Sequence, residues 1–467
     1  MTTLENTPFD AIEPGQRAEL RRLCTEDDFF AFAATTGNHN PLHLSTHDGD
    51  GDGVPEAVAP ALFVGSLVSA VLGTMLPGAG TVYLSQNFNF HARAAVGDEL
   101  LAAVEVVETG SDRRVRLATT VRRPADDTLL LDGEAWVRAP ERRLKFEAFE
   151  VPGLLVERHR HFDDLLARAA PLDPIPTAVV APEEPNSLSG ALLAMRHTII
   201  TPILVGAPER IAAAAADAGL STDGIEIIAA ASHEAAANKA VDLVADGRAR
   251  AVMKGHLHTD ELLRACLRRD RGLRAGRRFT HVFVMDVPGL DTPLLVTDAA
   301  INIAPDLATK VDIVQNAIDL ARAIGIEKPK VGVLSAVETV NTSIQSSVDA
   351  ALIAKMADRG QITGGLVDGP LAMDNAINLK AARTKGIGGD VAGLAEVLVV
   401  PGIDAGNMLA KQLTYVSHAE GAGVVLGASV PVILTSRADN DKARLASCAV
   451  AALHAHWTAS GGARSGH

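Results

Sequence analysis

The chain has 467 residues, of which 47% are hydrophobic and 21% charged, and its formal net charge is -14. This length exceeds one ordinary core, so we expect two or three domains. The negative charge argues against a nucleic-acid binder and requires local arginines and lysines to hold any anionic substrate. Three widely separated cysteines, Cys24, Cys266 and Cys448, favour a reducing, cytoplasmic setting over a disulfide framework.

The first chemically suggestive stretch is "TGNHNPLHLS" at residues 36–45. It combines a glycine, an Asn-Pro pair and His43 at short spacing, which is typical of a site that holds one imidazole and a polar neighbour. A carboxylate would suit the position two residues before the Asn-Pro pair, but Asn38 stands there. An amide can hold a water molecule but cannot take its proton, so Asn38 puts catalysis by this stretch in question.

An almost continuously apolar run follows at residues 58–76. Its length would suit a membrane span, but a proline, glycines and serines interrupt it, and we expect a buried helix and no membrane partner. Strand-like segments with short connections then continue to about residue 139, which predicts an antiparallel sheet. A sheet that wraps around one helix is the hot-dog architecture, so residues 1–150 are predicted to form an α+β hot-dog domain.

The rhythm changes after residues 151–172, which end in a proline-rich boundary and are expected to be a linker. Over residues 173–467, apolar strand-like runs alternate with helical runs, which predicts an α/β domain with a mainly parallel sheet in two lobes. Ligands of such sheets bind beyond the carboxyl ends of the strands, so polar residues after the predicted strands are expected to meet at one edge. These residues are Lys254, His256, Asp286, Asp298, Asn302, Ser335, Glu338, Asp368, Asp404, Asn407, Ser436, Arg437, Asp439 and Asp441.

The last of these clusters lies in "LTSRADNDKARL", which reads as a strand, a short loop and a helix N-terminus. Free N–H groups at the helix end and the planar guanidinium of Arg437 suit a phosphate, with Ser436 as a hydroxyl donor. Asp439 and Asp441 would repel a phosphate. They are candidates to cap the helix, to orient Arg437 or to accept a proton.

A second polar segment, "VMKGHLHTDELL", carries Lys254 and His256. His256 and His258 stand two residues apart, which can indicate a metal site, but no third ligand cluster stands out in the sequence. We therefore expect Lys254 and His256 to contact phosphate or a cofactor, and we expect no metal. The chain contains no GxxxxGK[ST] loop, which argues against a nucleotide triphosphatase.

Residues 173–467 resemble the phosphate acetyl/butyryltransferase family along essentially their whole length. The resemblance rests on the two segments above and on "HVFVMDVPG", "LLVTDAAINIAPDL", "GGLVDGPLAMDNAI" and "VPGIDAGNMLAKQL". It implies transfer of an acyl group between coenzyme A and inorganic phosphate, on a fold similar to that of isocitrate-type dehydrogenases. It also implies that Ser436 and Arg437 bind phosphate and that Asp441, in preference to Asp439, deprotonates the thiol.

Roughly residues 15–140 resemble MaoC-like (R)-specific enoyl-CoA hydratases through "TGNHNPLH", "SAVLGTMLPG", "GTVYLSQNFNF" and "AVGDEL". In that family an Asp and a His, in the pattern G-D-x-N-P-x-H, activate the water that adds across the double bond. His43 matches the His, and Asn38 replaces the Asp. The order of the two parts resembles that of bifunctional enoyl-CoA hydratase/phosphate acetyltransferases.

The sequence thus predicts a cytoplasmic acyl-CoA:phosphate acyltransferase that forms a homo-oligomer. Its substrates would be acyl-CoA and phosphate, with no tightly bound cofactor and no nucleic-acid partner. Three alternatives stay open. The N-terminal half could retain hydratase activity, it could be a non-catalytic CoA-binding or oligomerisation module, or the C-terminal half could transfer hydride on the related dehydrogenase fold.

Overall fold

The computed structural model describes residues 3–44, 48–49, 51, 53, 57–147, 159–435 and 439–462. The chain divides into two compact units, Met1–Val156 and Glu157–His467. Within the described ranges, no helix is both long enough and apolar enough to cross a membrane.

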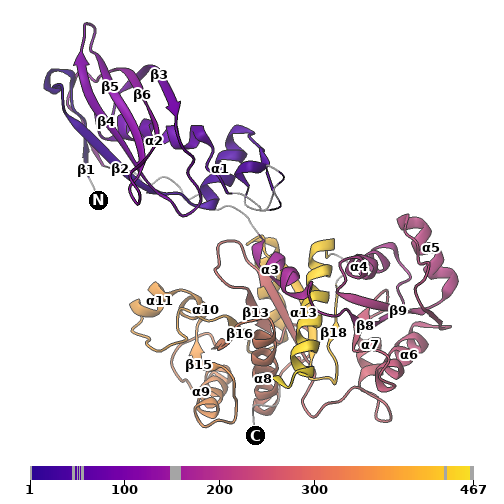
Figure 1. The fold of residues 1–467 in the computed structure, drawn as a ribbon. Coiled ribbons are helices and arrows are strands. Elements are labelled where there is room, and N and C mark those ends of the chain that lie inside the picture. The colour runs from indigo at the N-terminus through magenta and orange to yellow at the C-terminus, as the bar shows by residue number, and fades with distance from the viewer. Residues whose placement is uncertain are drawn as a thin grey trace. The chain divides into compact units, whose positions relative to one another are not determined.

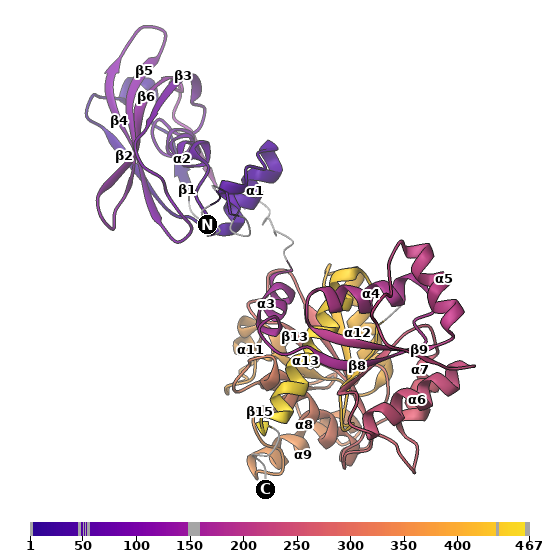
Figure 2. The same cartoon turned by 45° about the vertical axis from the view of Figure 1, so that its right-hand side comes forward.

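The first unit is a curved antiparallel sheet around one helix, as Figures 1 and 2 show, and the predicted hot-dog architecture is confirmed. The five strands follow the order β2-β4-β5-β6-β3, and β1 pairs separately with β7. The strands are β1 (Thr3–Glu5), β2 (Arg17–Leu23), β3 (Val82–Phe90), β4 (Glu99–Thr109), β5 (Arg114–Arg123), β6 (Thr128–Arg138) and β7 (Lys145–Glu147). The helices are α1 (Glu26–Thr36) and α2 (Ala61–Thr74), with short 3-10 turns η1 (Phe9–Ala11) and η2 (Pro41–His43).

Helix α2 is the apolar segment that the sequence predicted to be buried. Val68, Val71 and Leu72 are fully buried in a core shared with β4, β5 and β6. Gly65 allows close contact with β3, because a Cβ atom at this position would lie 2.8 Å from the ring of Phe88. The same run of apolar residues therefore serves as the centre of the domain.

The second unit is an α/β domain built on one sheet of eleven strands, in the order β10-β9-β8-β11-β18-β17-β12-β13-β16-β14-β15. The strands are β8 (Ile175–Val180), β9 (Ile200–Gly206), β10 (Ile227–Ala229), β11 (Ala251–Lys254), β12 (Thr280–Asp286), β13 (Leu294–Thr297), β14 (Lys330–Leu334), β15 (Leu366–Leu371), β16 (Val397–Val399), β17 (Glu420–Leu426) and β18 (Val432–Ile433). The helices are α3 (Arg160–Ala169), α4 (Pro185–Arg196), α5 (Pro208–Ala218), α6 (His233–Ala245), α7 (Thr259–Cys266), α8 (Leu307–Ala323), α9 (Gln345–Asp358), α10 (Met373–Ile377), α11 (Leu379–Thr384), α12 (Ile403–Tyr415) and α13 (Asp441–Ala459).

Most neighbouring strands of this sheet are parallel, as predicted, but the central pairs are not. β18 with β17, β17 with β12, and β12 with β13 are antiparallel. The strands on the β15 side of β12 therefore run opposite to those on the β10 side. This reversal of strand direction determines which polar residues lie at the same edge of the sheet.

Helices cover both faces of the sheet. On one face a single large core joins α3, α4, α5, α13, α8 and α9 across both lobes. On the other face two separate cores form, one around α6 and α7 and one around α10, α11 and α12. The predicted α/β class with a mainly parallel sheet is confirmed, whereas the division into two lobes stays a prediction.

Part of the segment predicted as a linker, residues 151–172, is a helix. α3 packs on α13 and buries Phe162, Leu165 and Ala169 at intervals of three and four residues. That spacing gives α3 an apolar face, so it joins the core of the second unit.

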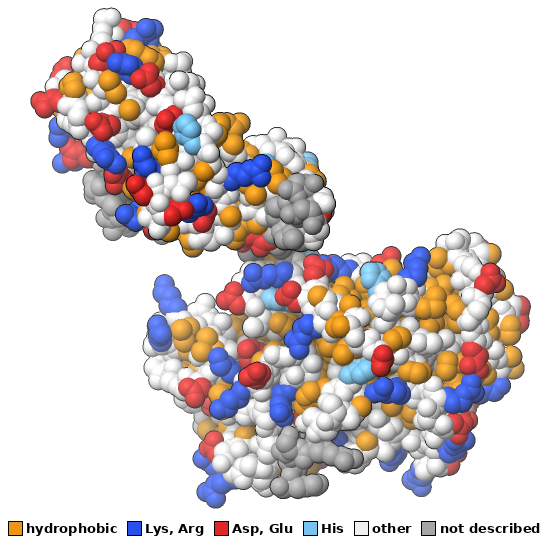
Figure 3. All heavy atoms as spheres, viewed as in Figure 1, with side chains coloured by type: hydrophobic (Ala, Val, Ile, Leu, Met, Phe, Trp, Pro, Cys, Tyr) orange, Lys and Arg blue, Asp and Glu red, His pale blue; other side chains and the backbone are white. Residues whose placement is uncertain are grey.

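Side chains of both charge signs are interspersed over the face shown in Figure 3. On this face the acidic net charge of the chain is accordingly not gathered into one patch.

Candidate active site

Lys254 and the loop after β18 lie side by side, because β11 and β18 are parallel neighbours with Met253 opposite Ile433. The hydroxyl of Thr435 donates to the Lys254 carbonyl oxygen at 3.4 Å. Ser436 and Arg437, the predicted phosphate ligands, follow directly, but they lie outside the described residues. The topology thus brings Lys254 next to the start of that loop.

A cavity of about 210 Å³ lies where this loop enters α13. Its polar lining comes from α12, from the start of β17 and from the loop itself. Its apolar lining comes mainly from β12 and from the end of α12. The residues are Phe283, Met285, Asn407, Ala410, Lys411, Thr414, Tyr415, Ala419, Glu420, Gly421, Asp439, Asn440 and Ala443.

The two candidate aspartates have different environments. Asp439 is half-buried and lines the cavity. Asp441 is the first residue of α13, its side chain is 73% exposed, and it is not among the described lining residues. Asn440 caps the helix, because its side-chain oxygen accepts the Ala443 N–H at 2.8 Å. This geometry favours Asp439 over Asp441 as a group that can reach a substrate.

Glu420 is a carboxylate that the sequence reasoning missed. It opens β17, which is antiparallel to β12, so it lies opposite Asp286 at the same edge of the sheet. The Asn440 amide donates to Glu420 Oε1 at 3.0 Å, and Glu420 lines the cavity. The rule for parallel sheets points only to residues after strands, whereas an antiparallel strand brings its first residue to this edge.

Asp286 ends β12 and is fully buried. Burial raises the pKa of its carboxyl, although the Phe162 N–H donates to Oδ2 at 2.9 Å and opposes the shift. Because that bond joins β12 to the first turn of α3, Asp286 holds the helix against the end of β12.

His256 is oriented by a carboxylate. Its Nε2 lies 2.8 Å from Glu184 Oε1, and its backbone N–H donates to the Ala181 carbonyl at 2.7 Å. Gly255 permits this close approach of β11 to β8, because a Cβ atom there would lie 2.3 Å from the Val180 carbonyl oxygen. His256 is thus fixed at the same edge as Lys254.

A second imidazole–carboxylate pair supports this arrangement. The His233 and His256 rings are 5.8 Å apart, and His233 Nε2 lies 3.2 Å from Glu183 Oε2. Burial raises the pKa of Glu183, but hydrogen bonds from Ala207 N–H, Arg210 and His233 outweigh it and lower the pKa below its usual value. Glu183 therefore stays ionised at neutral pH. Among the described residues there is no group of three or more His, Cys, Asp or Glu suited to hold a metal ion.

The expectation that all polar strand ends meet at one edge is wrong. Because β13, β14 and β16 run opposite to β11 and β18, their carboxyl ends lie at the other edge of the sheet. Asp298 forms a local turn there, with Oδ1 accepting the Ala300 and Ile301 N–H groups at 3.0 Å. The residues at or near that other edge are Asp298, Asn302, Ser335, Glu338 and Asp404, whereas Asp368 lies within β15 and Asn407 reaches the cavity from α12.

In the first unit, Gly37 caps the C-terminus of α1, and its φ of 73° turns the chain toward Asn38 and His43. The His43 ring bonds through Nδ1 to the Val58 carbonyl oxygen at 2.8 Å. A carbonyl only accepts, so Nδ1 carries the proton and a neutral ring leaves Nε2 as the acceptor. Asn38 is half-buried, and its Oδ1 accepts the Asn40 N–H at 3.3 Å.

Comparison with known proteins identifies both units. Residues 229–452 match the family model "Phosphate acetyl/butaryl transferase", and residues 9–126 match "MaoC like domain". The chain is 55% identical to a phosphate acetyltransferase of Rhizobium meliloti over 294 residues, which cover 63% of this chain and 93% of that protein. It is 43% identical to a phosphate butyryltransferase of Clostridium beijerinckii over 294 residues, or 63% and 97% of the two chains.

A solved structure supports the same assignment. The crystal structure of a branched-chain phosphotransacylase from Enterococcus faecalis is similar with a TM-score of 0.54 and 31% identity. The match covers 60% of this chain and 99% of that one. The chain therefore belongs to the phosphate acetyl/butyryltransferase family and carries a MaoC-like domain in its N-terminal half.

Proposed function

We propose that the second unit transfers a short acyl group between coenzyme A and inorganic phosphate. The observation that carries this proposal is the cavity where the loop after β18 enters α13, which is lined by carboxylates, a lysine and an apolar wall. In the sequence, Ser436 and Arg437 directly precede the part of this loop that lines the cavity. Relatives named phosphate acetyltransferase and phosphate butyryltransferase support the reaction class.

In the direction that consumes acyl phosphate, the thiol sulfur of coenzyme A attacks the carbonyl carbon and gives up its proton to the general base. The bond from that carbon to the phosphate oxygen then breaks, phosphate leaves, and the thioester remains. Two anionic substrates must approach each other, so cations have to offset their repulsion. Arg437, Lys254 and the N-terminus of α13 are suited to the phosphate, and Ser436 adds a hydroxyl donor. We assign His256 to the same anion-binding edge.

We assign the general base to Asp439. A cysteine-type thiol has a pKa of about 8.5 and an ordinary aspartate about 3.9, so full proton transfer before attack would be strongly uphill. The carboxylate therefore acts in concert with attack on the carbonyl carbon. The half-buried position of Asp439 in the cavity supports this choice over the exposed Asp441.

The apolar part of the cavity, formed by Phe283, Met285 and Tyr415, suits the acyl chain or the neighbouring thioester arm. Thiol release from acetyl-, propionyl- and butyryl-CoA, with and without phosphate, tests the proposal. We expect release that depends on phosphate. Thiol release at an equal rate without phosphate, or no release from any of the three thioesters, would contradict it.

For the first unit we propose an enoyl-CoA-binding site with weak hydration. His43 Nε2 is prepared to accept a proton by the bond from Nδ1 to Val58, but Asn38 cannot act as the second base. Loss of a general base typically costs about 10²–10⁴-fold in rate. Binding with slow turnover is the combination that these residues support.

Asn38→Asp should raise crotonyl-CoA hydration at least about tenfold, because the substitution is nearly isosteric and restores a carboxylate. Loss of the conjugated thioester absorbance measures the rate in the full-length chain, and activity should follow a carboxylate titration on the acid side. His43→Ala in the Asn38→Asp background serves as the control and should remove the gain. Strong hydration by the unsubstituted chain would show instead that another residue is the base.

We also propose that the two-lobed unit shares the architecture of isocitrate-type dehydrogenases and that the protein is a homo-oligomer. Exposed apolar side chains on and after α12, namely Met408 and Val416 at 69% and 67% exposure, support the second point. Light scattering on the purified chain measures the mass. A monomer at micromolar concentration would overturn this proposal.

A further inference from the structure

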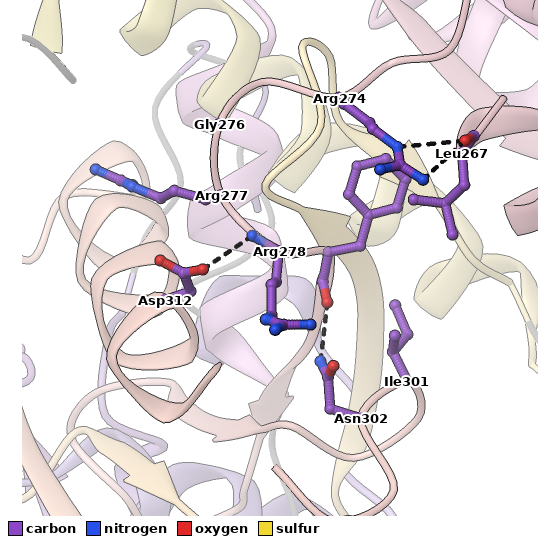
Figure 4. A pocket seen from close by; sticks show the side chains of 9 residues that line it. Leu267, Arg274, Gly276, Arg277, Arg278, Ile301, Asn302 and Asp312 are labelled. Atoms are coloured by element: carbon purple, nitrogen blue, oxygen red, sulfur yellow. Dashed lines mark hydrogen bonds between the residues drawn. The ribbon is translucent and has the colours of Figure 1, made fainter. Parts of the chain in front are cut away.

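A second cavity, of about 610 Å³, lies at the edge of the sheet opposite the candidate active site. It is formed by the loop that precedes β12, by the turn after β13 and by α8 (Figure 4). β12 begins where β11 and β18 begin, so the sheet separates this cavity from Lys254 and the loop after β18. Its volume falls in the range of small-molecule sites, roughly 300–1,000 Å³.

Three arginines line the cavity, and only one is neutralised by an ion pair with a residue that the structure describes. Arg277 Nη1 lies 2.6 Å from Asp319 Oδ2, and in Figure 4 its side chain turns away from Arg274 and Arg278. Arg274 donates only to the neutral Leu267 carbonyl, at 3.1 and 3.3 Å. Arg278 is exposed and extends toward Asn302 in Figure 4.

Acidic groups near Arg278 offset part of this positive charge, but the described lining contains three arginines and one aspartate and so keeps a net positive charge. Asp312 lines the cavity, and its Oδ2 accepts the backbone N–H of Arg278 at 3.0 Å. Hydrogen bonds from Thr309 lower the pKa of Asp306, and the positive charge of Arg278 lowers it further. Arg274 and Arg278 thus give the cavity a positive charge in a chain whose net charge is -14.

The other walls are apolar. Leu267, Phe279 and Ile301 line the cavity beside the two guanidinium groups. Guanidinium groups bind phosphate oxygens in a planar fork and also stack on flat rings. A ligand that binds both the guanidinium groups and the apolar side chains carries phosphate at one end and a flat, largely apolar group at the other.

We propose that this cavity is a second ligand site, which binds a phosphorylated aromatic anion of the adenosine-phosphate type. The phosphates contact Arg274 and Arg278, and the base lies against Leu267, Phe279 and Ile301. The ligand is either a free adenine nucleotide or the nucleotide end of coenzyme A. The site is separate from the one proposed for acyl transfer.

Calorimetric titration of the full-length protein with ADP, inorganic phosphate and coenzyme A tests the site. ADP should bind, and Arg278→Ala and Arg274→Ala should each raise its Kd about tenfold or more, as expected for the loss of one charge-assisted contact. Arg269→Ala is the matched control, because Arg269 is an exposed arginine of the same connection that does not line the cavity. It should leave the Kd of ADP unchanged.

The acyl-transfer site also has affinity for nucleotides if it binds coenzyme A. Lys411 lines that cavity and not the second one, so Lys411→Ala distinguishes ADP binding at the two sites. At the second site, ADP should bind with unchanged Kd in Lys411→Ala and with a raised Kd in Arg278→Ala, while Arg278→Ala keeps phosphate-dependent thiol release. If coenzyme A occupies this cavity as well as the acyl-transfer site, its titration should show two binding events in the unsubstituted protein and one in Arg278→Ala. If only a free nucleotide occupies this cavity, the titration with coenzyme A should show one binding event in both proteins. Absence of ADP binding, loss of it only in Lys411→Ala, or equal affinity for ADP and inorganic phosphate would overturn the proposal.

Discussion

Replacing Asp439 by Asn is expected to lower kcat for acyl transfer by about 10²–10⁴-fold, with KM for acyl phosphate and for coenzyme A changed only a few-fold. The substitution keeps the size and most hydrogen-bonding capacity of the side chain, but an amide cannot take the thiol proton. Because the proton moves only in the transition state, the loss should fall on turnover rather than on ground-state binding.

Two matched variants identify the base within this cavity. Asp441→Asn alters an exposed side chain on the first turn of α13 and should change kcat less than about threefold. Glu420→Gln alters a carboxylate that also lines the cavity but already accepts a bond from Asn440. A large fall in kcat for Asp441→Asn or Glu420→Gln, with Asp439→Asn near normal, would move the base to that residue.

The hot-dog half was predictable because its signals are local. One apolar helix and a series of strands with short connections leave few ways to bury that helix, and the strands indeed pair in antiparallel neighbours. The family resemblance agreed with His43 but not with Asn38, which stands where the family has an Asp. The orientation of the His43 ring could not be predicted from the sequence, because it depends on a hydrogen bond to the carbonyl of Val58, fifteen residues away.

The prediction that all polar strand ends meet at one edge of the sheet was wrong. The sequence nevertheless indicates the reversed strand direction through the lengths of two connections. Only seven residues separate Asp286 at the end of β12 from Leu294 at the start of β13, and five separate β17 from β18. A parallel crossover needs a dozen or more residues, so both connections require antiparallel pairs. This length rule separates Asp298 and Ser335 from Lys254, and it brings Glu420 to the same edge as Lys254.

The choice between Asp439 and Asp441 could not be made from the sequence. "ADNDKARL" offers three consecutive residues that can each cap a helix, and the cap decides which aspartate belongs to the helix. The structure starts α13 at Asp441 with Asn440 as the cap. A small shift in the start of α13 would change which of the two aspartates lies on the helix and which lines the cavity.

Arg437→Ala should raise KM for phosphate and lower kcat/KM by roughly 10- to 150-fold, which corresponds to the loss of one charge-assisted bidentate contact of about 1.5–3 kcal/mol. KM for coenzyme A should change much less. Arg437→Lys should recover little of the loss, because an ammonium group restores charge but cannot offer two parallel N–H donors.

The control for Arg437→Ala is Lys442→Ala, which removes a positive charge five residues further along the chain. Lys442 Nζ is directed to α3, where it lies 2.8 Å from Asp163 Oδ1 and donates to the His159 carbonyl oxygen at 2.9 Å. If the charge acts on phosphate only in a general electrostatic way, both variants should raise KM for phosphate to a similar extent. If Arg437 contacts phosphate directly, only Arg437→Ala should raise it. Initial rates at varied phosphate and fixed acetyl-CoA distinguish these cases, and near-normal phosphate kinetics in Arg437→Ala would locate the phosphate away from the loop after β18.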